Sequence, residues 1–137
     1  MEAYARRTRS PPPLTSPAVA SPFSAATTAD ASALVLGAAY TSMRELVSGS
    51  FPGGIPHGWV SEVEIDTLSR IGRIGMPLVM AHGDEDDRIP YRMGEEVFRH
   101  AAEPKAFIRM EGVNHVDLIQ EAAPEISASL DELLGPM

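Results

Sequence analysis

The sequence predicts an α/β fold with about three parallel strands, flanking helices and a disordered N-terminus. Two apolar runs, residues 78–81 and 106–110, have the length of buried strands. Between them, apolar residues recur at the spacing of an amphipathic helix, so the segment predicts one strand-helix-strand unit. Such a connection joins parallel strands. A third apolar run, residues 33–36, supplies the remaining strand.

Residues 1–30 form a region of their own. They are rich in Ser, Thr, Ala and Pro, include three consecutive prolines at 11–13, and contain only two acidic residues. This composition predicts a disordered, low-complexity extension. Because the segment is also basic, an organelle targeting peptide is the alternative interpretation. The folded domain is therefore expected to occupy residues 31–137.

The strand at residues 33–36 leads into a short helix. Ser42 is expected to cap this helix, because Glu45 three residues later completes a capping box. Residues 48–60 are rich in Gly and Pro, which predicts a loop. A short helical or turning segment then leads into Pro77, which cannot lie inside a central strand.

The second strand, residues 78–81, is expected to end at a sharp turn. His82 and Gly83 follow it, and glycine permits the backbone conformations that such a turn requires. The next helix starts after Pro90. We expect Pro104 to stop it, since proline cannot continue a helix.

The third strand, residues 106–110, is followed by a turn at Gly112. The last helix is expected at residues 124–134, where apolar residues share one face. These apolar residues are Ile126, Leu130, Leu133 and Leu134. The helix should cover the strand that ends at Met110.

Two side chains beyond the ends of neighbouring strands form the candidate site. Asp86 belongs to a run of four acidic residues after one strand, and His115 follows the next strand. They are 29 residues apart, one strand-helix-strand unit, so parallel strands bring their tips together. Taken singly, each suits a turn carboxylate or a loop histidine. Together they suit a hydrolytic pair, in which the carboxylate fixes the imidazole tautomer and the imidazole moves the proton.

Other polar residues near these turns have structural interpretations. Asp84 and Asp117 are expected to accept backbone N–H bonds. His57 and His100 have no suitable partner spacing and are expected on the surface. A hard cation prefers oxygen-rich clusters, but the spacing here matches no EF-hand loop. That alternative metal site would use His82, Asp84, Asp86 and Asp87. We expect no metal and no cofactor.

The strings HGDEDDRIP, EPKAFIRM and EGVNHVDL resemble the C-terminal half of α/β-hydrolases, particularly the serine aminopeptidase or prolyl-oligopeptidase-like branch. The resemblance extends over residues 33–134. In that branch the acid is the Asp of an H-G-x-x-D-x-x-x-P turn and the base is the His of a G-x-x-H turn. Asp86 and His115 match these positions. The resemblance implies a partial α/β-hydrolase fold and the hydrolysis of an ester, amide or peptide.

The resemblance also implies a serine nucleophile, which this chain lacks. The family places that serine in a G-x-S-x-G elbow upstream of the other two residues, and no such string occurs here. Ser50 directly follows Gly49 and precedes a proline by two positions, so we reject it as the nucleophile. The chain is expected to be truncated before the elbow and to be inactive alone.

Further implications of the resemblance concern the pocket. Tyr40, Thr41 and Ser42 either line its floor or only cap a helix. Four side chains of the 48–60 loop either touch an apolar part of the substrate or pack over the sheet edge. They are Phe51, Ile55, His57 and Trp59.

The expected partner is a small-molecule ester, amide or peptide substrate, bound once a missing half completes the fold. A sheet that lacks its preceding strands would expose the edge from Leu34 to Ala38. Such an edge can pair with another chain, so self-association is expected there. The alternative function is therefore a non-catalytic remnant or interaction module.

Composition excludes several other classes. The formal net charge is −8 and no Lys/Arg stripe is present, which argues against nucleic-acid and anionic membrane surfaces. No apolar run approaches the roughly 18 residues of a membrane span. The absence of cysteine excludes disulfides and thiolate chemistry. We expect a cytoplasmic protein without nucleic-acid or membrane partners, with the targeting peptide as the alternative.

Overall fold

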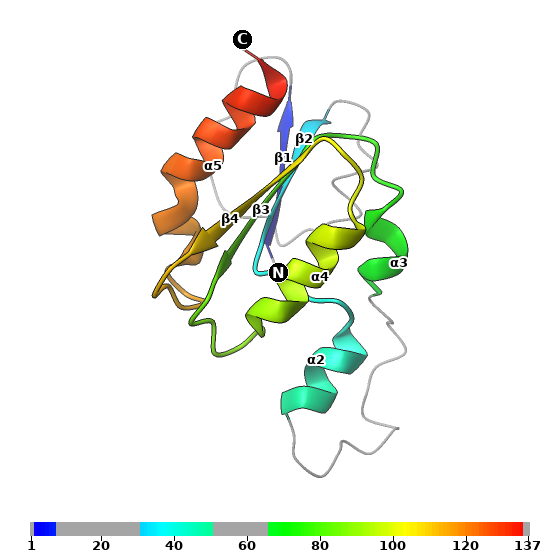
Figure 1. The fold of residues 1–137 in the computed structure, drawn as a ribbon, viewed down its shortest axis with the longest axis vertical. Helices are drawn as coiled ribbons and strands as arrows, with labels where there is room; N and C mark the ends of the chain where they lie inside the picture. The colour runs from blue at the N-terminus through cyan, green and yellow to red at the C-terminus, as the bar shows by residue number, and fades with distance from the viewer. Residues whose placement is uncertain (1, 8–30, 51–65, 136–137) are drawn as a thin grey trace.

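The computed structural model describes residues 2–7, 31–50 and 66–135, which form one four-stranded sheet of order β1-β2-β3-β4 (Figure 1). Strands β2 (Ala31–Gly37), β3 (Leu78–Gly83) and β4 (Lys105–Met110) are parallel neighbours. Strand β1 (Glu2–Arg7) runs antiparallel to β2. The predicted α/β fold with three parallel strands is confirmed.

Helices cover both faces of the sheet (Figure 1). They are α2 (Met43–Ser50), α3 (Leu68–Ile71), α4 (Tyr91–His100) and α5 (Leu118–Leu134). Alternate residues of a strand point to opposite faces. Accordingly, Leu34, Leu36 and Met80 pack with α4, whereas Val35 and Val79 pack with α5. Strands β2 and β3 are therefore buried on both faces, as parallel strands usually are.

Short-range hydrogen bonds start two of the helices. The Glu45 backbone N–H donates to Ser42 Oγ at 3.2 Å, which confirms Ser42 as the cap of α2. The Glu45 carboxylate instead accepts from the Thr41 hydroxyl and from Arg92, so the capping box is only half formed. At α3, Asp66 Oδ1 accepts the Ser69 N–H at 3.1 Å.

The residues of β1 belong to the N-terminal segment for which the sequence predicts disorder. These residues were expected to be disordered, and they form a strand whose backbone pairs with β2 from Glu2↔Gly37 to Arg7↔Ala31. The pairing satisfies hydrogen-bonding groups that an edge strand would leave free. Hence the edge from Leu34 to Ala38, expected to be exposed, is occupied through Gly37. Residues 8–30 lie outside the described residues.

Three element ends also differ from the expectation. His82 and Gly83, expected in a turn, continue β3. Helix α4 ends at His100, ahead of Pro104. Helix α5 begins at Leu118 rather than 124, with Pro124 inside it, because the burial of its first turns offsets the hydrogen bond that proline cannot donate. It packs on β2 and β3 as well as on β4.

None of the helices in the described ranges combines the length and the apolar character that crossing a bilayer requires.

Candidate functional site

The turn after β3 folds around the side chain of Asp86. Its Oδ1 accepts the backbone N–H of Arg88 at 2.9 Å and that of Ile89 at 2.8 Å. This is the local pattern by which aspartate stabilises a turn. The side chain has no exposed surface. Consequently the other carboxylate oxygen, Oδ2, is held in one direction.

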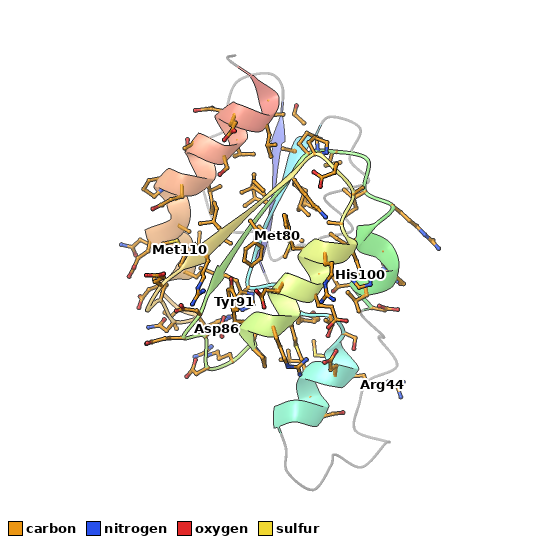
Figure 2. The ribbon with its side chains drawn as sticks, viewed as in Figure 1. Arg44, Met80, Asp86, Tyr91, His100 and Met110 are labelled. Carbon is orange, nitrogen blue, oxygen red and sulfur yellow. The ribbon has the colours of Figure 1, made fainter. Side chains whose placement is uncertain are left out.

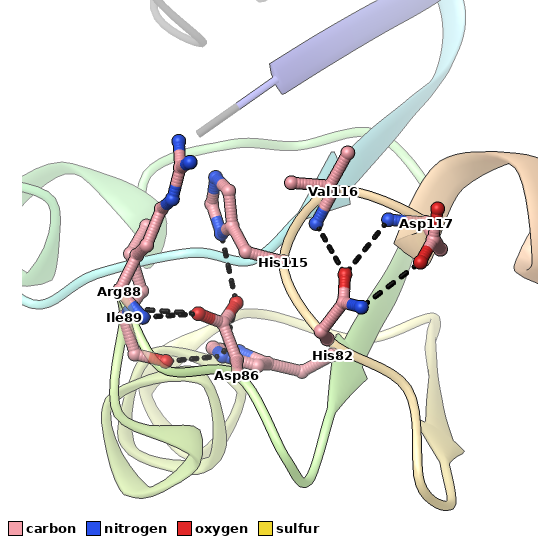
Figure 3. Close-up of polar contacts among 8 residues, drawn as sticks. His82, Asp86, Arg88, Ile89, His115, Val116 and Asp117 are labelled. Atoms are coloured by element: carbon pink, nitrogen blue, oxygen red, sulfur yellow. Dashed lines mark hydrogen bonds and ion pairs between the residues drawn. The ribbon is translucent and has the colours of Figure 1, made fainter.

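That oxygen faces His115. The distance from Asp86 Oδ2 to His115 Nδ1 is 2.8 Å, and the imidazole keeps 24% of its side-chain surface exposed (Figure 3). The contact arises because β3 and β4 are parallel and in register, with Gly83 opposite Met110, so the segments after the two strands start side by side. The structure thus brings together the two residues that the sequence singled out.

The protonation states follow from the surroundings of Asp86. Burial raises the pKa of this carboxyl, but the hydrogen bonds from Ile89, His115 and Arg88 outweigh burial, and the net pKa is lowered. The group is therefore ionised at neutral pH and can only accept hydrogen bonds. His115 Nδ1 must then carry a proton and donate it, so in the neutral form of the imidazole the lone pair is on Nε2. In Figure 3 that second nitrogen points away from the carboxylate.

Asp84 anchors the loop that carries His115. Its Oδ1 accepts the Gly112 N–H at 2.8 Å, and its Oδ2 accepts from Arg109 Nη2 at 2.9 Å. The hydrogen bond from Gly112 and then that from Arg109 lower the pKa of Asp84. The predicted turn-stabilising role of Asp84 is confirmed. The turn that it stabilises is the one at Gly112, which follows the neighbouring strand β4.

The loop is also held by Asn114, which the sequence analysis did not single out. Asn114 Oδ1 accepts the N–H of Val116 at 2.8 Å and that of Asp117 at 3.1 Å. The side chain of Asp117, expected to accept a backbone N–H, accepts the Asn114 amide at 2.9 Å. An asparagine next to a histidine in a predicted turn was the available signal.

His82, which the sequence suggested only for the alternative metal site, also lies beside Asp86. It is fully buried at the end of β3, with Nε2 2.9 Å from the Ile89 carbonyl oxygen and 3.6 Å from Asp86 Oδ2. A histidine directly after an apolar strand run was the signal. His100, by contrast, lies at the far end of α4 from Asp86 and Tyr91 (Figure 2). It is exposed, as expected.

A hollow of about 270 Å³ opens beside His115. It lies where β2 ends and α5 begins. The residues lining it are Gly37, Ala38, Arg88, His115, Val116, Leu118 and Ile119. Ala38 has φ of 49°, an unusual left-handed conformation for alanine that places backbone strain at the wall of this hollow. Tyr40 and Thr41 are buried and do not line this hollow.

The metal alternative receives no support from the described geometry. Asp84 is turned toward Arg109 and Gly112, and His82 is buried under Ile89. Within residues 2–7, 31–50 and 66–135, no group of three or more His, Asp or Glu side chains could hold a metal ion. The side chains expected over the pocket, including His57, lie outside the described residues.

Comparisons with known proteins show the fold. No family model matches the chain. Two curated, uncharacterized proteins of Mycobacterium tuberculosis are 31% identical over 85 residues, which is 62% of this chain and 30% of each relative. The chain thus spans less than a third of their length. The esterase domain of a Rhodothermus marinus protein superposes with a TM-score of 0.61 at 13% identity, covering 81% of this chain and 54% of that domain. Over the part that superposes, the chain therefore shares the fold of that domain.

Proposed function

We propose that this domain supplies the acid and base of a serine-hydrolase site, with His115 as the base and Asp86 as the residue that orients it. The observation that carries the proposal is the 2.8 Å contact between Asp86 Oδ2 and His115 Nδ1, made by a buried carboxylate and a partly exposed imidazole. A hydrolase with a Ser-His-Asp triad uses this pairing, because the carboxylate fixes the tautomer and stabilises the imidazolium.

The chemistry would run through His115 Nε2. This nitrogen would take the proton of a serine hydroxyl as the serine oxygen bonds to the carbonyl carbon of the substrate. Asp86 would stay ionised and stabilise the resulting imidazolium. The same proton would then pass to the leaving alcohol or amine as the scissile bond breaks. Water would release the acyl group in a second cycle of the same kind.

The substrate class is proposed more broadly than the chemistry. The resemblance of the strings around Asp86 and His115 to the serine aminopeptidase or prolyl-oligopeptidase-like branch favours an ester, amide or peptide. The name of the Rhodothermus marinus domain favours an ester. The hollow beside His115 has the apolar side chains of Val116, Leu118 and Ile119 on its wall, which suits the acyl part of such a substrate.

The chain lacks a G-x-S-x-G elbow, so we expect it to be inactive by itself. The oxyanion hole is incomplete as well, because one of its donors is the residue after the nucleophile. Purified chain and the His115→Ala variant should hydrolyse p-nitrophenyl acetate at the same background rate. A fluorophosphonate should label no serine. Activity above background that disappears in His115→Ala would show that the nucleophile is already present.

The proposal also has a positive test. A longer protein that places a G-x-S-x-G elbow ahead of residue 33 should hydrolyse the ester and react with the fluorophosphonate. In that protein, His115→Ala should lower kcat by at least about 10³-fold, since triad members act as a unit. His100→Ala, an exposed histidine on α4, is the matched control and should leave kcat unchanged. Full activity in the His115→Ala protein would contradict the assigned base.

A second candidate function is an interaction module that pairs with another chain through the edge of β2. Its central residues, Ala33 to Leu36, are 0–6% exposed and its edge is paired with β1. We propose that association through this edge requires β1 to leave. Deleting residues 1–7 should therefore shift the protein to larger species in size-exclusion chromatography with light scattering. A peptide of residues 1–7 added back should reverse the shift, and an unchanged mass would contradict the proposal.

A further inference from the structure

His82 has an environment that defines its protonation. Its Nε2 lies 2.9 Å from the Ile89 carbonyl oxygen, which can only accept, so Nε2 carries a proton and donates it. Its Nδ1 is buried and has no hydrogen-bond partner in the described part of the chain. A proton on Nδ1 would therefore be buried and unsatisfied. The ring is accordingly neutral, in the tautomer with Nε2–H.

The ring is also held in place by its neighbours. His82 is the penultimate residue of β3. The ring of Tyr91 packs edge-on against the imidazole of His82, with the two ring centroids 5.6 Å apart. Gly94, one turn further along α4, also lies against the ring. A Cβ at Gly94 would overlap His82 Nδ1 and come within 3.0 Å of Cγ, so the helix backbone packs directly on the imidazole. His82 cannot move without displacing α4 or β3.

One residue connects His82 to the candidate site. The Ile89 carbonyl accepts from His82, and the Ile89 N–H donates to Asp86 Oδ1 at 2.8 Å. Asp86 Oδ2 in turn meets His115 at 2.8 Å (Figure 3). His82 Nε2 is 3.6 Å from that same oxygen, which is too long for a hydrogen bond. The N–H group of His82 is nevertheless close to the carboxylate of Asp86. Ile89 is buried, so the chain of contacts is shielded from water.

We propose that His82 is a positioning residue, which fixes the 86–89 turn through the Ile89 carbonyl so that Asp86 Oδ2 faces His115. This inference rests on the proposed function, because positioning Asp86 matters only if His115 acts as a base. The hydrogen bonds themselves can be measured without any catalytic activity. Because His82 is neutral, it does not compete with His115 as a cationic partner of the Asp86 carboxylate. Burial lowers the pKa of His82, and the charged groups that act on it are Asp86, His115 and Glu95.

Two substitutions separate the hydrogen bond from simple packing. His82→Gln keeps a donor near the position of Nε2, whereas His82→Leu fills similar space without one. We expect His82→Leu to lose the low-field proton resonance of His115 Nδ1–H and to raise the pKa of Asp86 toward its ordinary value, because the Ile89 N–H is no longer held in place. His82→Gln should retain both signals. NMR of the isotopically labelled 137-residue chain measures them without any activity.

Gly94→Ala tests the same inference from the other side. The added methyl must displace the imidazole from its present position or move α4, although Gly94 is not among the hydrogen-bond partners of Asp86 or His115. It should weaken the His115 Nδ1–H resonance as His82→Leu does. Unchanged His115 and Asp86 signals in either variant would overturn the proposal.

A measurement on the unmodified chain keeps the proposal testable even where a variant does not fold. Ring ¹⁵N shifts should show His82 neutral with its proton on Nε2. A proton on Nδ1 at neutral pH would overturn the proposal. If a longer protein with a G-x-S-x-G elbow did not hydrolyse esters, that result would count against the proposed function alone. The NMR signals report the position of Asp86 whether or not a reaction occurs.

Discussion

Replacing Asp86 with asparagine is expected to lower the free energy of unfolding at pH 7 by about 3 kcal/mol. Asparagine can still offer an oxygen to the Arg88 and Ile89 N–H groups, but it turns an amide NH₂ toward His115 where a carboxylate oxygen accepted before. The side chain is fully buried, so water cannot replace the lost contact. Guanidinium unfolding followed by circular dichroism measures the change.

The effect of this substitution should depend on pH with a definite sign. The folded-state pKa of Asp86 is lowered below the ordinary value of about 3.9, so the carboxylate stabilises the folded state above that value. This stabilisation is lost as the pH falls through the folded-state pKa. The difference between the natural chain and Asp86→Asn should therefore shrink as the pH falls below about 4.

Asp87→Asn is the matched control for Asp86→Asn. Asp87 is the next residue in the same acidic turn and is exposed. Its substitution should change the free energy of unfolding by no more than about 0.5 kcal/mol, as is usual for surface positions. Equal effects of the two substitutions would contradict the buried contact between Asp86 and His115. A pH-independent difference would contradict an ionised Asp86.

Sequence patterns were sufficient for the parts of the site that local chemistry determines. The apolar runs located β3 and β4, and the spacing of Asp86 and His115 placed both side chains at neighbouring strand tips. Ser42 and Asp84 were assigned correctly for the same reason, since capping and turn-forming side chains act on nearby or register-matched backbone. These predictions required only the period of each element and the parallel connection.

Other features could not be predicted because they depend on contacts between distant segments. The pairing of β1 with β2 joins residues separated by the whole of 8–30. His82 becomes a positioning candidate only when α4 packs its Gly94 against the ring. Gly83 was interpreted as a turn residue, yet it lies in β3, where its lack of a side chain admits the 111–117 loop. A glycine at the end of an apolar run can thus mark either a turn or a close approach of another backbone segment. Which of the two applies depends on the segment that packs against it.

Replacing Gly83 with alanine is therefore expected to lower the free energy of unfolding by about 3 kcal/mol, near the upper range for overpacking a rigid site. The new Cβ would overlap the Val113 carbonyl oxygen and lie 2.8 Å from its carbonyl carbon. These are backbone atoms, which cannot rotate away as the end of a flexible side chain can. The loop that carries His115 must move instead, so the Asp86–His115 hydrogen bond should be lost together with stability.

Gly75→Ala provides the matched control for Gly83→Ala, because a Cβ at Gly75 meets no atom within 4 Å. That variant should stay within about 0.5 kcal/mol of the natural chain, or gain slightly from a less flexible unfolded state. Thermal unfolding and the His115 Nδ1–H resonance should be measured for both variants. If Gly83→Ala kept the resonance and the stability of Gly75→Ala, the close approach of β3 to the 111–117 loop would be wrong, and the placement of His115 beside Asp86 would need another explanation.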